Sequence, residues 1–241
     1  MEDLTVAWAL RALLPLADPR VARQQQTYFK ETRVVLGVTT DDTRRVAYAL
    51  AARIDAGWAP GRVLVALEPF VRDRRDEVKS VGLLACEKLW PRLDAALLAR
   101  ARRWFLADWC DSWAAVDALC IGAIGPLLVA RPALAPRVLP WARSRNLWLR
   151  RAGVVALVKP VRKALLLDEA YAVAAGLLGD GEDLMHKATG WMLREAGKPD
   201  MRRLERFLLE HGPRIPRTAL RYAIERFPER ERRRILAATR G

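Results

Sequence analysis

The feature that most constrains this chain is a long series of short apolar segments with helical spacing. Apolar side chains recur every three or four residues, and no stretch alternates apolar and polar residues as a half-buried strand does. Helix-starting and helix-ending residues punctuate the series at Thr39-Thr40-Asp41-Asp42, Pro60, Pro91, Pro132, Gly179-Asp180-Gly181 and Pro199. The pattern predicts an all-α protein with helices at residues 3–15, 19–31, 40–55, 60–70, 75–89, 94–107, 111–123, 132–142, 146–158, 163–177, 182–195, 200–210, 214–225 and 228–238.

Short helices with short connections are typical of stacked helical hairpins. Polar or aromatic landmarks recur on every second predicted helix, at Arg44/Arg45, Lys79, Asp117, Arg151, Trp191 and Arg221. Their separation of roughly 30 to 40 residues is the size of one two-helix HEAT-type repeat. We therefore predict a single domain, residues 1–241, built as an α-solenoid of HEAT-like repeats whose landmark residues line one concave, basic groove.

The charge balance favours an anionic partner. The chain has 42 Lys and Arg against 28 Asp and Glu, a formal net charge of +14. Such a surface attracts nucleic acid first and acidic membrane second, and a basic concave groove suits a DNA duplex. The alternative is that an Arg-rich, high-GC genome accounts for the excess.

Several chemistries are absent from the sequence. Three cysteines without a CxxC pair and only two histidines argue against a metal site and against a disulfide framework. No Gly-rich phosphate loop, Ser-His-Asp arrangement or paired-carboxylate motif is present, so we expect no metal and no cofactor. No uninterrupted apolar run approaches the roughly 18 residues of a membrane span, and the N-terminus lacks a signal-peptide pattern. We expect a soluble, monomeric protein of the bacterial cytosol that associates with the nucleoid.

Trp113 and Asp117 are the most informative pair. At roughly 100° per residue they lie about 40° apart around one helix axis. No charged residue occurs within four positions of Asp117 on either side, so the carboxylate stays ionised only if water or a cation reaches it. The pair is suited to meet a cation from outside its own helix; the alternatives are a core Trp and an ordinary surface carboxylate. The apolar stripe of this helix points elsewhere and comprises Val116, Leu119, Cys120 and Ala123.

Two further segments carry candidate DNA-binding residues. Arg150 and Arg151 interrupt an otherwise apolar helix, where a guanidinium forms either a structural salt bridge or a clamp for phosphate oxygens. Trp191 follows Gly190, which would let another group approach the backbone closely, and lies one turn after Lys187. The alternative for Trp191 is again packing in the core.

These stretches also carry a family resemblance. The chain resembles the AlkD-type DNA alkylation-repair glycosylases, which are built from HEAT-like repeats. The matching stretches span most of the chain: Tyr28-Phe29-Lys30, Leu36-Gly37-Val38-Thr39-Thr40 with Arg44-Arg45, Trp113 through Asp117, Asn146-Leu147-Trp148-Leu149-Arg150-Arg151-Ala152, and Lys187 through Glu195.

The resemblance implies a role for each matched residue. Asp117 falls on the catalytic aspartate, Trp113 and Trp191 on the two active-site tryptophans, Arg151 on the functional arginine and Tyr28 on an aromatic near the DNA. In this reading Arg151 and other basic residues of the groove would hold phosphates, and the candidates are Arg44, Arg45, Arg150, Arg151, Lys187 and the landmark residue Arg221. One departure is that the run here is Ser112-Trp113-Ala114-Ala115-Val116-Asp117, whereas the family often has a second aromatic and an acid, as in Trp-Trp-Asp-Ser-Val-Asp. The missing acid bears on the substrate range more than on the reaction.

The implied activity is that of a monofunctional DNA glycosylase. It would hydrolyse the N-glycosidic bond of cationic N3- or N7-alkylated purines in duplex DNA and leave an abasic site. Two other functions are compatible with the residues: a non-catalytic HEAT-repeat DNA-binding protein, and a protein-interaction scaffold whose basic groove meets acidic peptides.

Overall fold

The computed structural model describes residues 4–240, and these residues fold into helices joined by turns and loops. Within them the one β-type pairing is an isolated bridge between Val34 and Arg75. The prediction of an all-α protein is confirmed. The chain divides into two compact units, residues 1–124 and residues 125–241, and each is described by itself.

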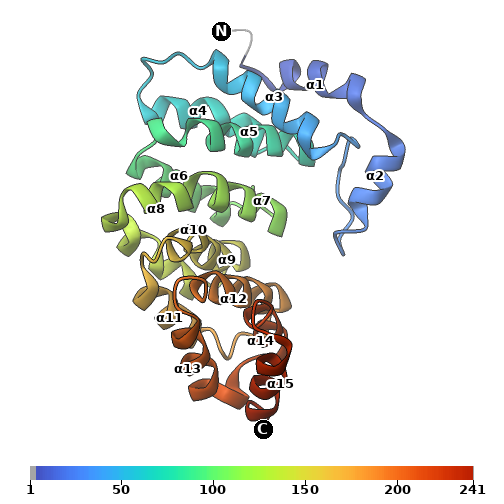
Figure 1. The fold of residues 1–241 in the computed structure, drawn as a ribbon. Coiled ribbons are helices and arrows are strands. Elements are labelled where there is room, and N and C mark those ends of the chain that lie inside the picture. Colours follow the sequence, from blue (N-terminus) through green and yellow to red (C-terminus); the bar gives the residue numbers. More distant parts are fainter. Residues whose placement is uncertain (1–3, 241) are drawn as a thin grey trace. The chain divides into compact units, whose positions relative to one another are not determined.

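The first unit contains seven α-helices among its described residues, shown from blue to green in Figure 1. They are α1 (Val6–Leu13), α2 (Pro19–Gln26), α3 (Thr40–Arg53), α4 (Pro60–Val71), α5 (Asp76–Leu89), α6 (Ala95–Leu106) and α7 (Trp113–Leu119). Short 3-10 turns follow α1 and α5 at Leu14–Leu16 and Trp90–Arg92. A π-helical turn, Cys120–Ile124, follows α7.

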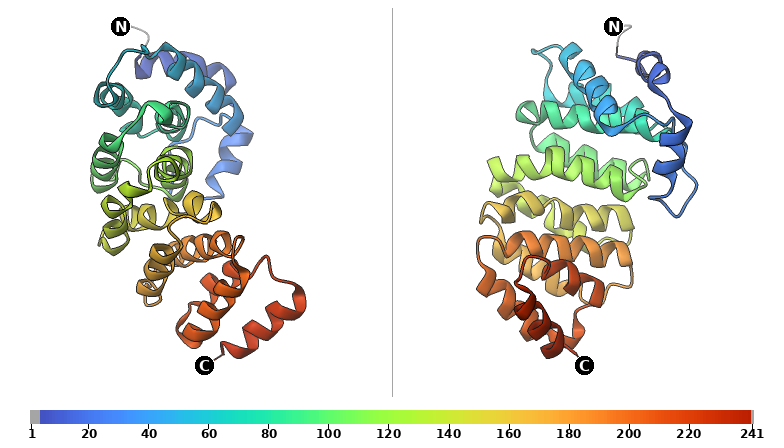
Figure 2. Two further views of the ribbon diagram at one scale, coloured as in Figure 1. Left: turned by 60° about the vertical axis from the view of Figure 1, so that its left-hand side comes forward. Right: turned by 45° about the vertical axis from the view of Figure 1, so that its right-hand side comes forward.

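Helix α5 is the central element of the first unit. It packs against α3, α4 and α7, and α4 packs against α6, so α3, α5 and α7 form one row and α4 and α6 another (Figure 2). Ten of the fourteen residues of α5 are buried, including the charged Glu77 and Lys79. Gly82 allows α4 to approach closely, because a Cβ there would lie 2.8 Å from the Cβ of Phe70.

The second unit contains α8 (Gly125–Ala130), α9 (Leu147–Val155), α10 (Val158–Arg162), α11 (Leu167–Gly176), α12 (Asp183–Ala196), α13 (Met201–His211), α14 (Arg217–Ala223) and α15 (Glu229–Ala238). Three 3-10 segments connect them, at Pro132–Arg137, Leu139–Arg143 and Gly212–Arg214.

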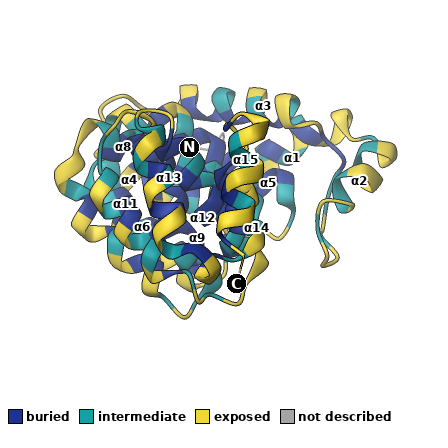
Figure 3. Ribbon diagram, turned by 60° about the horizontal axis from the view of Figure 1, so that its bottom comes forward, coloured by how far each residue is buried: buried dark blue, intermediate teal, exposed yellow. Residues whose placement is uncertain are grey.

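Helix α12 has the central place in the second unit that α5 has in the first. It packs against α9, α10, α11 and α14, and α13 packs against α15. Figure 3 shows α9 and α12 mostly buried, whereas α13 and α15 expose one long face each. Successive helices in each unit thus stack in two rows, which confirms the predicted α-solenoid type of fold. The HEAT-repeat boundaries, the concave groove and the single domain over residues 1–241 stay predictions.

Most predicted helices are present, and the departures have local causes. The first predicted helix begins at residue 3, which lies outside the described residues. The prediction of a helix at 132–142 was wrong: two 3-10 segments occur there, because Pro136 and Pro140 interrupt the α-helical hydrogen bonds. Helix α2 ends at Gln26 rather than at residue 31. Helix α11 begins at Leu167 instead of 163, after Leu166 adopts a left-handed conformation with φ of 56°.

Candidate active site

The first turn of α7 positions Trp113 and Asp117. Ser112 is the N-cap residue, and its hydroxyl accepts a hydrogen bond from the backbone N–H of Ala115 at 3.2 Å. Trp113 is the first helical residue, and Asp117 follows one turn later. Both side chains are partly exposed. The expected apolar stripe of Val116, Leu119, Cys120 and Ala123 is fully buried, which confirms that Asp117 lies on the flank of the core face.

Trp113 is held by the segment that precedes α3. The indole stacks on Phe29 with ring centroids 5.6 Å apart and an interplanar angle of 25°. Its Nε1–H donates to the backbone oxygen of Tyr28 at 3.4 Å, across 85 residues of sequence. Tyr28 as a residue is 59% exposed. The structure therefore brings together two of the predicted lesion-binding aromatics, Tyr28 and Trp113, and adds Phe29.

An ion cluster that the sequence analysis did not predict lies next to Phe29 and consists of Arg33, Asp76, Lys79 and Asp111. Arg33 binds Asp76 at 2.5 Å and Asp111 at 3.0 Å, and Lys79 also binds Asp111. Lys79 is only 4% exposed, so the expectation that it lines an open groove was wrong: its ammonium serves the cluster instead. The one sequence signal for the cluster was the acidic residue two positions before Trp113.

The pKa values of the cluster follow from its contacts. Burial alone would raise the pKa of Asp111, but hydrogen bonds from Arg33 and Lys79 outweigh it and lower the pKa below its ordinary value. The hydrogen bonds that Arg33 donates to the Asp76 carboxylate raise the pKa of Arg33 despite its burial. Arg33 and Asp111 are therefore both charged at neutral pH.

Glu77 fixes the backbone of residues 36–38, which directly precede α3. Its buried carboxylate accepts hydrogen bonds from the N–H groups of Leu36 and Gly37 at 2.8 Å and of Val38 at 3.2 Å. Gly37 has a φ of 84°, and a Cβ at this position would overlap the backbone oxygen of Asp18. The Leu36-Gly37-Val38 stretch therefore requires both the glycine and the buried acid.

Helix α9 carries the two candidate arginines of the second unit. Arg150 donates to Asp180 at 2.7 Å and to the carbonyl oxygens of Ser144 and Arg145 at 2.8 and 3.2 Å. This is the structural salt bridge that the sequence left open as an alternative to phosphate binding. Arg151 is 5% exposed and donates to the carbonyl oxygen of Leu184 at 2.6 Å. Both guanidiniums thus have structural hydrogen bonds within the second unit.

Helix α12 presents Trp191 and Lys187. Trp191 is partly exposed, and the preceding Gly190 is buried against α14, where a Cβ would lie 2.6 Å from that of Tyr222. The predicted close backbone approach at Gly190 is confirmed. Lys187 pairs with Asp183 at 2.8 Å, and this hydrogen bond raises the pKa of the lysine.

The remaining predicted phosphate-binding residues lie at the surface. Arg45 has a side chain that is 79% exposed and paired with Asp42. Arg44 bonds to Asp41 at 3.3 Å and lies 4.0 Å from Glu87. Arg221, on α14, is exposed. These side chains are accessible to a polyanion without rearrangement of the core.

Thiol and metal chemistry have little support among the described residues. No group of three or more His, Cys, Asp or Glu in residues 4–240 could hold a metal ion. Cys86, Cys110 and Cys120 are buried thiols. Burial raises the pKa of Cys86 to about 12 and also raises that of Cys110, so these two thiols are poor nucleophiles.

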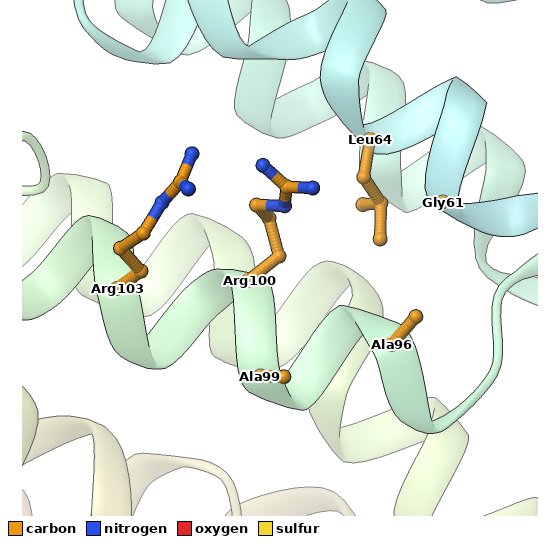
Figure 4. A pocket seen from close by; sticks show the side chains of 6 residues that line it. All are labelled: Gly61, Leu64, Ala96, Ala99, Arg100 and Arg103. Carbon is orange, nitrogen blue, oxygen red and sulfur yellow. The ribbon is translucent and has the colours of Figure 1, made fainter.

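A pocket of about 290 Å³ lies between α4 and α6 (Figure 4) and contains none of the predicted site residues. Its lining is formed by Gly61, Leu64, Ala96, Ala99, Arg100 and Arg103. Both arginines bind Glu68, Arg100 at 3.0 Å. Glu68 therefore already neutralises part of the positive charge of these two arginines.

One apolar stretch departs from the sequence expectation about membranes. Within residues 4–240, the helical stretch Trp113–Ala130 is long and apolar enough to cross a membrane, with a mean hydropathy of 1.9. More than half of it, 56%, is buried inside the structure. A core helix has this property, and the stretch includes Asp117.

Comparison with known proteins gives two matches. The model of the family described as DNA alkylation repair enzyme matches residues 9–227. A solved structure titled a predicted DNA alkylation repair enzyme from Enterococcus faecalis superimposes with a TM-score of 0.77 at 17% identity, covering 88% of this chain and 97% of that chain. At this identity the structural likeness shows a shared fold. No curated protein matches the sequence.

Proposed function

The chain belongs to the family of DNA alkylation repair enzymes, and on that premise we propose that it is a monofunctional DNA glycosylase. In this proposal it hydrolyses the N-glycosidic bond of cationic N3- or N7-alkylated purines in duplex DNA and leaves an abasic site. The observation that supports this most directly is the first turn of α7, where a partly exposed indole and a partly exposed carboxylate follow each other by one turn.

A single carboxylate is sufficient for this reaction. An N3- or N7-alkylated purine already carries a positive charge, so it leaves as a neutral base and no general acid is required to protonate it. Most glycoside hydrolases need a second carboxyl group because their leaving group has to be protonated. In our proposal Asp117 stabilises the oxocarbenium-like sugar and orients the attacking water. Trp113 offers its π-face to the cationic nucleotide, which contributes about 0.5–2 kcal/mol.

The proposal of a monofunctional enzyme draws support from Lys187. Strand cleavage by a bifunctional glycosylase needs a neutral amine that attacks the sugar. Lys187 is the lysine nearest in sequence to Trp191, and its pKa is raised by Asp183. A protonated ammonium is a poor nucleophile, so hydrolysis by water is favoured.

Binding of the duplex is assigned to the second unit and to α3. We propose that Trp191 offers a second partly exposed indole and that Lys187, Arg221, Arg44 and Arg45 contact phosphates. Arg150 and Arg151, whose guanidiniums have structural hydrogen bonds, contribute mainly by shaping α9. Electrostatic binding of this kind weakens steeply as salt increases. We further propose that the protein acts on duplex DNA as a monomer in the cytoplasm.

The decisive experiment is release of free 7-methylguanine from a methylated duplex under single-turnover conditions. Wild type should release the base, and Asp117→Asn should slow release by about 100-fold or more, the effect of losing one charge-stabilising group. Asp168→Asn is the matched control, because it removes one carboxylate that is 88% exposed on α11, and it should release base at the wild-type rate.

Other results would identify the alternatives. If Asp117→Asn released base as fast as wild type, Asp117 would not be catalytic. Wild-type protein that binds duplex at low salt but releases no base would be a non-catalytic DNA-binding member of the family. Protein that fails to bind duplex at low salt would be a scaffold for other ligands, such as acidic peptides.

A further inference from the structure

The segment of residues 27–36, between α2 and α3, is a closed loop rather than an extended linker. The Gln26 side-chain amide donates to the carbonyl oxygen of Glu31 at 2.8 Å and accepts from the backbone N–H of Arg33 at 2.8 Å. Farther along, the Val34 carbonyl oxygen accepts from the N–H of Asp76 at 2.9 Å. The loop therefore has a defined shape and is fixed at its end to the start of α5.

Arg33 joins this loop to the start of α7. Its guanidinium makes two hydrogen bonds to the Asp76 carboxylate and two to the Asp111 carboxylate. It also donates to the Asp111 backbone oxygen at 3.3 Å. The Arg33 side chain is only 10% exposed, so solvent competes little for these bonds. One side chain thus links three elements separated by 43 and 78 residues of sequence.

The same loop carries the rings that contact Trp113. The Arg33 guanidinium lies 5.6 Å from the centroid of Phe29, which in turn stacks on Trp113. Asp111 directly precedes the N-cap residue Ser112, so its position sets where α7 begins. Displacement of Arg33 would therefore act on Trp113 along two routes, through the stacked rings and through the helix start.

We propose that Arg33 is a positioning residue: by joining the loop 27–36 to the N-terminus of α7, it fixes the Trp113 indole against Phe29 and holds Tyr28 beside it. Arg33 does not contact the reacting atoms in this proposal. The inference rests on the proposed glycosylase function for its effect on rate, whereas its effect on structure is independent of that function.

The test compares Arg33→Gln with Arg75→Gln in the full chain. Arg75 is a matched control because its guanidinium forms a partly buried pair with Asp73, with bonds of 2.8 and 2.6 Å, and contacts neither Phe29 nor Asp111. Phe29→Leu is a second variant, which removes the stacked ring and leaves the ion cluster intact. Two quantities are measured: the single-turnover rate of base release, and amide hydrogen exchange in peptides covering residues 27–36 and 113–119.

Arg33→Gln should speed exchange in both peptides and slow base release about 10-fold, with undiminished affinity for undamaged duplex. Phe29→Leu should slow release about 2- to 10-fold, the range for losing one aromatic pair. Arg75→Gln should change neither quantity.

Unchanged exchange in residues 113–119 of Arg33→Gln would overturn the coupling, and an unchanged rate beside faster exchange would overturn the positioning role. If wild type released no base, the proposed function would fail, and the exchange data alone would still decide whether Arg33 couples the loop to α7.

Discussion

The two units of this protein differ sharply in how they use charge. Residues 1–124 contain 18 Lys and Arg and 16 Asp and Glu, whereas residues 125–241 contain 24 and 12. In the first unit, Asp76, Asp111 and Glu77 bind cations or backbone N–H groups and so fix the loop before α3. The second unit has a large surplus of cations. Balanced charge thus shapes the unit that carries Asp117, and surplus charge lies in the unit to which we assign most of the affinity for DNA.

The largest expected effect tests the structural role of charge in the first unit. Glu77→Gln replaces a buried carboxylate that accepts three backbone N–H bonds with an amide that can accept through one oxygen only. Unfolding in urea should show a loss of about 2–3 kcal/mol. Glu31→Gln, an exposed change in the same loop, should cost little; equal stability of the two variants would contradict the assignment.

The next effect tests whether the first unit governs chemistry rather than affinity. Trp113→Ala should slow release of 7-methylguanine about 10-fold, since one cation–π contact contributes about 0.5–2 kcal/mol. Affinity for undamaged duplex should stay at the wild-type value. Trp58→Ala, a partly exposed tryptophan that stacks with Arg62 at 4.0 Å, is the control. A loss of duplex affinity in Trp113→Ala would break the division between the units.

A smaller effect compares one cation from each unit. Arg221→Gln should lower the slope of log affinity against log salt by about 0.9, the value for one phosphate contact. Arg45→Gln should lower it less, because Asp42 already neutralises part of that charge. Fluorescence titrations with one duplex at several salt concentrations measure both slopes. A larger change for Arg45 would reverse the proposed assignment of affinity.

The smallest effect concerns pH and an exposed pair of the second unit. A hydrogen bond from Lys187 lowers the pKa of Asp183 below its ordinary value of 3.8. The pair therefore stabilises the fold above pH 3.8, and this contribution is lost as pH falls through the lowered pKa. Asp183→Asn should cost about 0.3–0.5 kcal/mol at pH 7 and nothing near pH 2. A deficit in the urea midpoint that grew on acidification would show that the sign is wrong.

Local sequence features predicted the elements whose structure depends on neighbouring residues. Apolar spacing located α3, α5 and α12 within two residues at each end. The four-residue interval between Trp113 and Asp117 placed both side chains on one flank of α7. The stretch 132–142 has a helical composition and periodicity, and the prediction of an α-helix followed from these. Its internal prolines instead produce two 3-10 segments.

The ion cluster could not be predicted because its partners are distant in sequence. Arg33 is 43 residues from Asp76 and 78 from Asp111, and in the sequence each resembles an ordinary surface charge. Lys79 has the spacing of a repeat landmark, yet its helix turns it inward toward Asp111. Only the packing of α5 against α7 shows that these charges meet.

Gly190 sets the spacing between α12 and α14 in the second unit. Because no side chain separates α12 from α14 at this point, the width between the two helices is determined by direct backbone contact with Ala219. Alanine, serine and valine at position 190 would act as spacers of increasing thickness. Such a series would change the distance between Trp191 and Arg221 while leaving both side chains intact. It would therefore measure how strictly activity depends on the spacing between α12 and α14.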